Sequence, residues 1–169
     1  MKNLKTAENV SWILLNAIER DFYHDPDMKN ILRHTIRRVS DGTNCWHASN
    51  EFRSKEVVRL TAHLSKRSAY HDFCNKNFRH EHVVPATVIY EYIGQLKEPT
   101  YSAILDTLIR FCITATVTRE EDQRLDKLGL KSKMPAQFHD YTHELFDDPF
   151  ARYKIAGIFE NLEPGFRAT

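Results

Sequence analysis

The helical spacing of apolar residues over most of the chain is the sequence feature that most limits its fold. Apolar side chains three and four positions apart form one buried stripe on a helix, whereas short runs of β-branched residues favour a strand. Two segments interrupt the helical pattern: residues 78–84, which Pro85 ends, and residues 112–117 (CITATV). The sequence therefore predicts a single domain (1–169) of the α+β class, mostly α-helical with a small two-stranded β element.

The expected helices are bounded by residues that commonly start or end helices. Asp25 followed by Pro26 is a typical helix start, and Thr118 with Glu121 three positions later forms a capping box. Gly129 is placed to end the helix that Thr118 begins. We expect helices over residues 6–22, 26–39, 50–65, 86–97, 100–109, 118–129, 137–146 and 149–159, and an irregular polar segment over residues 66–77.

Composition excludes several classes of protein. The 169 residues suffice to bury a core without disulfides, and no apolar run approaches the roughly 18 residues of a membrane span. No apolar segment follows the basic start, as it would in a signal peptide, and the three cysteines form no CxxC pair. We therefore expect a cytoplasmic protein with reduced thiols and no membrane partner.

Basic residues are concentrated in one part of the chain. The net charge is +1, but residues 29–79 contain eleven Lys or Arg against four Asp or Glu, which gives +7 there and −6 in the remainder. This separation favours a polyanionic partner on one side of the molecule, although solvated helix faces are the simpler explanation of the counts alone. We divide the expected domain into a basic helical part (1–77), a central part (78–135) and C-terminal helices (136–169).

The densest group of chemically active side chains lies in residues 80–85 (HEHVVP). On a strand, His80 and His82 share one face and Glu81 points to the other, but at the end of a strand neighbouring side chains can converge on one ion. A second acidic group, residues 120–122 (EED), opens the helix that follows the second expected strand. Imidazoles and carboxylates are the side chains that most often transfer protons and bind divalent cations.

Two segments resemble the HNH, or ββα-metal, family of nucleases. Residues 81–85 (EHVVP) are similar to the signature that ends the first strand of that family, and residues 115–122 (ATVTREED) are similar to its second strand and metal-binding helix. The Met-Pro pair at 134–135 lies where such domains often leave that helix. The resemblance spans residues 78–135 and implies a ββα-metal-like core.

The resemblance implies a metal-dependent endonuclease that hydrolyses phosphodiester bonds of nucleic acid, with DNA as the expected substrate. His82 would be the general base, because an imidazole accepts a proton from water near neutral pH, and His80 would be a further catalytic residue that contacts phosphate. Glu81 would bind one Mg²⁺ or Mn²⁺ ion, with Asp122 as the expected second ligand and Glu121 as the other candidate. The ion would neutralise charge on the phosphate.

Cations of the basic part would hold the flanking phosphates in a salt-sensitive way. A homodimer would suit an enzyme of the restriction type. The expected nucleic-acid contacts are Arg53, Arg59, Lys66, Arg67, Lys76 and Arg79.

Two other functions fit the same sequence. Four histidines in two closely spaced pairs would suit a zinc-dependent hydrolase or a zinc-binding protein: His80 and His82, and His139 and His143. The second alternative function is that of a non-catalytic relative of a nuclease, which binds nucleic acid or protein. The acidic residues 120–122 also suit the start of a helix without any ligand.

Overall fold

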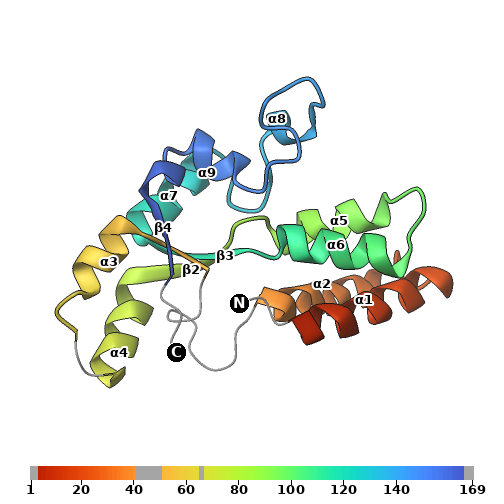
Figure 1. The fold of residues 1–169 in the computed structure, drawn as a ribbon, viewed down its shortest axis with the longest axis horizontal. Coiled ribbons are helices and arrows are strands. Elements are labelled where there is room, and N and C mark those ends of the chain that lie inside the picture. The colour runs from red at the N-terminus through yellow and green to blue at the C-terminus, as the bar shows by residue number, and fades with distance from the viewer. Residues whose placement is uncertain (1–3, 41–50, 65–66, 166–169) are drawn as a thin grey trace.

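A computed structural model describes residues 4–40, 51–64 and 67–165 (Figure 1). In these ranges the helices are α1 (Leu4–Glu19), α2 (Pro26–Ser40), α3 (Lys55–Thr61), α4 (Arg67–Asn77), α5 (Ala86–Gly94), α6 (Tyr101–Phe111), α7 (Arg119–Lys127), α8 (Ala136–His139) and α9 (Ala151–Ile155), followed by a 3-10 turn, η1 (Phe159–Asn161). The strands are β1 (Phe52–Ser54), β2 (Phe78–His82), β3 (Thr114–Thr118) and β4 (Leu162–Pro164). The predicted α+β class, with helix as the main component, is confirmed. None of the described helices combines the length and apolar character that crossing a membrane requires.

The four strands form one sheet in the order β2-β3-β1-β4. The two predicted strands pair with each other in antiparallel register, with His80 opposite Thr116. The sheet is larger than the expected two-stranded element, because β1 pairs with β3 in parallel and β4 pairs with β1 in antiparallel orientation. Each additional strand has only three residues, which is too short for a two-residue repeat to stand out in the sequence.

The region between α2 and β2 differs most from the prediction. β1 occupies the start of the helix expected over 50–65, and Ser54 ends the strand because its hydroxyl oxygen accepts a hydrogen bond from the amide of Val57 (3.3 Å) and caps α3. The polar segment 66–77, expected to be irregular, contains α4. Its Cys74 is buried in the same small apolar cluster as Val57, so tertiary packing supports a helix whose surface pattern is weak.

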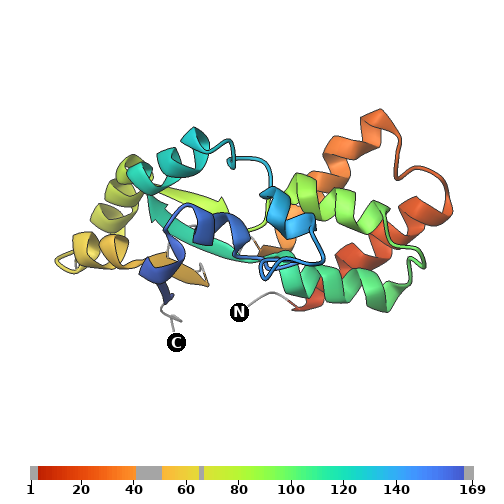
Figure 2. The same ribbon diagram turned by 90° about the horizontal axis from the view of Figure 1, so that it is seen from above.

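Two larger apolar cores lie at opposite ends of the molecule, as Figure 1 and Figure 2 show. The first is formed by α1, α2, α5 and α6 and includes Leu14, Ile36 and Ile89. The second lies between the sheet and the helices α7 and α9 and includes Val117 and Leu125. The helices α5 and α6 connect β2 to β3. Although they lie in sequence between two paired strands, both helices pack in the first, helical core and not in the core beside the sheet.

The chain passes between the two cores immediately after β2. Val83 is buried in the sheet core and Val84 in the helical core, and the chain returns between Cys112 and Ile113. The amide of Val83 donates to the carbonyl of Ile113 (2.8 Å), so the two crossings lie side by side. The two valines of the EHVVP segment therefore serve different cores, and the residues just before them lie at the junction.

α7 has both ends that the sequence predicts. The hydroxyl oxygen of Thr118 accepts from the amide of Glu121 (3.2 Å), and Oε2 of Glu121 accepts from the amide of Thr118 (2.8 Å). At the other end Gly129 has a left-handed backbone (φ 69°), and the amide of Leu130 donates to the carbonyl of Leu125 (2.8 Å). These caps fix α7 directly after β3, so β2, β3 and α7 form a strand, strand, helix unit in which α5 and α6 are inserted between the two strands.

The C-terminal helices are shorter than the two helices predicted there. α8 ends at His139 because Oδ1 of Asp140 accepts hydrogen bonds from the amide (3.0 Å) and the hydroxyl (2.7 Å) of Thr142. Such a local turn replaces the helical hydrogen bonds that would follow. His143 lies beyond this turn, so the single helix predicted over residues 137–146, which would have placed His139 and His143 on one face, is wrong.

Two stacked tyrosines join the turn between α1 and α2 to α5. The rings of Tyr23 and Tyr90 have centroids 4.5 Å apart and are parallel to within 4°. Each hydroxyl donates to the main-chain carbonyl of the other residue. Burial, reinforced by the neighbouring Tyr90, raises the pKa of Tyr23 above its ordinary value of 10.0. The folded protein therefore retains the Tyr23 proton at a pH where the unfolded chain releases it.

We predict that stability falls steeply above about pH 10 and that Tyr23→Phe reduces this fall. The free energy of unfolding should decrease by up to about 1.4 kcal/mol per pH unit from this residue alone, because the unfolded state binds fewer protons there. At neutral pH the variant should be about 1 kcal/mol less stable, since its hydrogen bond to Tyr90 is lost. Urea unfolding at neutral and alkaline pH measures both effects. An unchanged alkaline slope would contradict the prediction, and Tyr141→Phe, which alters an exposed ring, is the control.

Candidate active site

The end of β2 carries three of the residues predicted to form the site. His80, Glu81 and His82 are all half-buried. The ladder with β3 holds them in register, with His82 opposite Thr114, and Pro85 begins α5 soon afterwards. Because the strand stops here, its last side chains face a space that neither core fills.

The two histidines lie on one face of β2, as the two-residue repeat of a strand predicts. Their rings meet edge to face with centroids 5.8 Å apart. On this side, Nδ1 of His82 is 3.2 Å from Oγ of Ser40, the last residue of α2. This contact joins α2 to the predicted general base across 42 positions of sequence.

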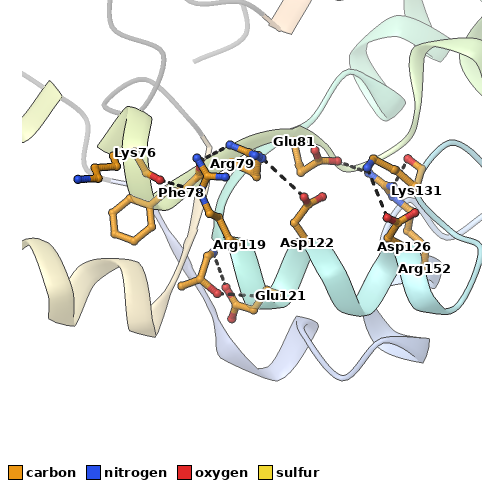
Figure 3. Close-up of polar contacts among 11 residues, drawn as sticks. Lys76, Phe78, Arg79, Glu81, Arg119, Glu121, Asp122, Asp126, Lys131 and Arg152 are labelled. Atoms are coloured by element: carbon orange, nitrogen blue, oxygen red, sulfur yellow. Dashed lines mark hydrogen bonds and ion pairs between the residues drawn. The ribbon is translucent and has the colours of Figure 1, made fainter. Parts of the chain in front are cut away.

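Arg152 of α9 holds the end of β2 in place. The side chain is only 1 % exposed, and a buried guanidinium requires an acceptor for each of its donors. Its five acceptors come from the end of β2 and from the turn after α7, and Figure 3 shows two of these residues, Glu81 and Lys131, beside Arg152. They are the main-chain carbonyls of His82, Val83 (2.7 Å), Leu130 (2.8 Å) and Lys131 (3.0 Å) and Oε2 of Glu81 (3.3 Å).

Glu81 and Asp122 form a pair of carboxylates where β2 packs on α7. Figure 3 shows the Asp122 side chain directed from the first turn of α7 toward β2, beside Glu81. Burial raises the pKa of Glu81; Arg152 opposes this effect, and the charge of Asp122 adds to it. The two carboxylates therefore repel each other in a poorly solvated place, an arrangement that a bound cation would relieve.

One oxygen of Asp122 lacks a partner. The Asp122 side chain is 13 % exposed, and its Oδ2 lies 3.7 Å from Nε of Arg79. Its Oδ1 is buried and accepts no hydrogen bond in the described part of the chain. A buried carboxylate oxygen without a donor is unfavourable, so this atom is suited to a ligand.

The two carboxylates suit a hard cation that needs few protein ligands, rather than one held in a complete cage of protein side chains. Within the described ranges, no group of three or more His, Cys, Asp or Glu side chains gathers closely enough to bind a metal by itself. Mg²⁺ is commonly held by one or two carboxylates and completes its shell with waters and substrate oxygens. Glu81 and Asp122 meet this lesser requirement.

Glu121, the alternative metal ligand, instead caps the start of α7. Its Oε2 caps α7 by accepting from the amide of Thr118, and its Oε1 lies 3.8 Å from Nη2 of Arg124. The side chain is buried and lies in the capping box rather than beside Glu81. Of the two acidic candidates on α7, the structure brings only Asp122 to the strand end.

A pocket of about 680 Å³ opens at the junction of the two cores. Its lining includes His80, Glu81 and His82 from β2 and the start of α5. The remaining polar lining comes from α2, from the turn after α7 and from α9: Arg33, His34, Arg37, Arg38, Lys131, Ser132 and Arg152. The pocket therefore combines imidazole and carboxylate groups with a strongly cationic wall.

Of the cations predicted to contact nucleic acid, the four whose side chains the structure describes do not line this pocket: Arg53, Arg59, Lys76 and Arg79. Arg53 is buried in β1 with 8 % exposure, so it is not the surface cation that was expected. Arg59 is exposed but donates to Glu56 at 2.7 Å and 2.5 Å, and Arg79 faces Asp122. Lys76 is exposed near the start of β2. Arg67 belongs to α4, and Lys66 lies outside the described residues.

The two C-terminal histidines lie apart from the pocket. The His139 ring packs against Phe138 with centroids 5.0 Å apart, and Nδ1 of His143 accepts from the amide of Leu145 (3.0 Å). Neither is among the residues that line the pocket with His80 and His82. The geometry therefore does not unite the four histidines of the zinc hypothesis.

The arginines of α2, Ser40 and Arg152 are site residues that sequence reasoning missed. The basic spacing of residues 33, 37 and 38 is visible on the predicted helix. Its direction toward β2 depends on how α2 packs, which local patterns do not specify. The residues around Arg152 in the sequence do not indicate whether its side chain is buried or exposed.

Similarity to known proteins assigns no family. No protein-family model, curated protein or solved structure matches the chain significantly. The HNH resemblance of residues 81–85 and 115–122 stays a prediction from the sequence. The strand, strand, helix order is a fold-level feature, and chemistry resides in the side chains it positions.

We predict that Arg152→Met lowers the free energy of unfolding by about 3–5 kcal/mol, because it leaves Glu81 and four carbonyls without their buried donor. Arg152→Lys should fail to restore stability, since an ammonium group cannot reach acceptors spread over two segments. Urea unfolding measures the losses. Lys154→Met removes an exposed cation of the same helix that pairs with the half-buried Asp148 (2.6 Å), and it should cost less than about 1 kcal/mol. Similar small losses in both methionine variants would contradict the role of Arg152.

Proposed function

We propose that the protein is a metal-dependent endonuclease that hydrolyses phosphodiester bonds of nucleic acid, with His82 as its general base. The observation that carries this proposal is the pocket where the imidazoles and carboxylate of β2 face the arginines of α2. Phosphodiester hydrolysis needs a base for water and positive charge to shield the anion. The pocket lining contains groups for both tasks, and DNA is the substrate that the HNH resemblance favours.

We assign His82 the removal of a proton from the attacking water. The contact of its Nδ1 with Ser40 orients the ring, and Nε2 is the atom that would accept the proton. Arg152 holds the main chain at this position through the His82 carbonyl, so the imidazole projects from a fixed strand end. His80 shares the face and would contact the substrate phosphate.

Glu81 and Asp122 are the residues that would hold a Mg²⁺ or Mn²⁺ ion. Their support is the buried Oδ1 of Asp122, which has no hydrogen-bond partner among the described residues, and the mutual repulsion of the two carboxylates. A bound ion would neutralise charge on the phosphate and stabilise the leaving oxygen. Arg152 lies beside Glu81 and favours its ionised form, and Nε of Arg79 lies 3.7 Å from Oδ2 of Asp122.

We predict that His82→Ala reduces cleavage of an oligonucleotide by about 100-fold or more, because the general base is lost. Binding of the oligonucleotide in EDTA and the melting temperature should stay close to those of the unmodified protein. A cleavage assay with Mg²⁺ or Mn²⁺ measures the effect. His139→Ala is the matched control, since it removes an imidazole outside the pocket lining and should cleave normally. Full activity of His82→Ala would contradict the proposal, and loss of activity in the control would favour the zinc hypothesis.

We predict that Asp122→Asn raises the Mn²⁺ concentration needed for half-maximal cleavage by about tenfold or more. The substitution keeps the shape of the side chain and removes the charge that the ion would balance. Asp126→Asn is the control, because Asp126 lies one turn further along α7 and forms only an exposed pair with Lys131 (3.6 Å). An identical metal dependence in the Asp122 variant would exclude Asp122 as a ligand. No cleavage by the unmodified protein with either metal, despite binding, would favour a non-catalytic binding protein.

A further inference from the structure

Two arginines of α2 line the pocket and carry buried donors that have no hydrogen-bond partner among the described residues. Arg33 and Arg37 are one helical turn apart, are both half-buried and line the pocket opposite β2. Nε of each is buried and has no hydrogen-bond partner among the described residues. Nη2 of Arg33 donates to Oγ1 of Thr87 on α5 (2.5 Å), which holds this guanidinium at the pocket wall.

The positive charge of this wall is not balanced by the protein in the described ranges. Glu81 is the acidic residue among those that line the pocket, and it is already paired with Arg152. Arg33, Arg37 and Arg38 form no ion pair with a described carboxylate. Neighbouring guanidinium groups in a partly desolvated place repel each other, so an anion that enters the pocket is attracted strongly.

A phosphate group matches these donors in shape as well as in charge. A guanidinium presents a planar fork of N–H groups that binds two phosphate oxygens at once. Arginines four positions apart lie on the same face of a helix, so both can approach one phosphate from the same side. The pocket volume of about 680 Å³ also lies within the range of sites that accept organic ligands.

We infer that Arg33 and Arg37 form a phosphate-binding site that holds a backbone phosphate of a nucleic-acid strand next to His82. That a phosphate binds here is inferred from the pocket alone. That this phosphate belongs to a nucleic-acid strand rests on the proposed function. Such a site moves the substrate contact from the cations expected on β1, α3 and α4 to the pocket face of α2. Arg38 and Lys131, at the pocket margin, would attract the neighbouring strand.

The test is binding of a fluorescent oligonucleotide in EDTA, where no metal-dependent cleavage occurs, over a series of salt concentrations. The Arg33→Gln/Arg37→Gln double variant should bind at least about tenfold more weakly, and its slope of log affinity against log salt should fall by about one, as expected for one lost phosphate contact. Arg37→Lys should retain most of the slope but not the full affinity, because it keeps the charge and loses the fork.

The control is Arg20→Gln, which removes an exposed arginine just after α1, outside the pocket lining, and should leave affinity and slope unchanged. Circular dichroism melting establishes that each variant is folded. If the double variant does not fold, Arg37→Gln alone carries the test, since none of the described residues accepts a hydrogen bond from its Nε. Inorganic phosphate and a nucleoside monophosphate are titrated in parallel as competitors.

The outcomes separate this inference from the nuclease proposal. Normal affinity and slope in the Arg33 and Arg37 variants, or loss of both in the Arg20 control alone, would overturn the inference whether or not the protein cleaves. Binding of free phosphate without binding of the oligonucleotide would overturn the assignment to a strand. Arginine-dependent binding of the oligonucleotide supports the inference, whether or not the protein cleaves. Failure to cleave with Mg²⁺ or Mn²⁺ would overturn only the proposed endonuclease activity.

Discussion

The buried guanidinium of Arg152 is the interaction on which the rest of the site depends. β2 ends where the chain leaves one apolar core for the other, and main-chain groups at such a crossing need partners that a regular ladder does not supply. Arg152 provides donors to the carbonyls of His82 and Val83 and to the turn after α7. The same group pairs with Glu81, so one buried charge sets the direction of the strand end and of the carboxylate on it. This double use explains why a residue remote in sequence belongs to the site.

The location of the pocket follows from the two-core architecture. α5 and α6 extend from the sheet and pack with α1 and α2, as Figure 1 and Figure 2 show. α2 thereby ends beside β2, and its last residue, Ser40, meets His82. A junction between two cores is a common place for ligand sites, because side chains from both sides converge where neither core is continuous. Here the sheet side supplies imidazole and carboxylate groups, and the helical side supplies arginines.

Local patterns predicted much of the secondary structure and the half of the site that is adjacent in sequence. Helix caps such as Thr118 with Glu121 were correct because a cap is a short-range hydrogen-bond arrangement. The side-by-side histidines of β2 followed from the two-residue repeat. The strands β1 and β4 could not be predicted, because three residues stabilised by pairing with distant partners have no period of their own. The α2 wall was missed for a related reason: a helix pattern shows which face is polar but not which element that face meets.

The long connection between β2 and β3 also bears on the order in which the molecule assembles. These strands are paired but are joined by residues 83–113 rather than by a tight turn, so their ends meet only after an entropically unfavourable loop closure. Docking of α5 and α6 on the first two helices shortens that search, and β4 completes the sheet from the far end of the sequence. Contacts between segments distant in sequence slow folding. A nascent chain that ends soon after β2 would thus contain both histidines and α2 yet lack Asp122 and Arg152, so the groups of the candidate site come together only in the fully assembled molecule.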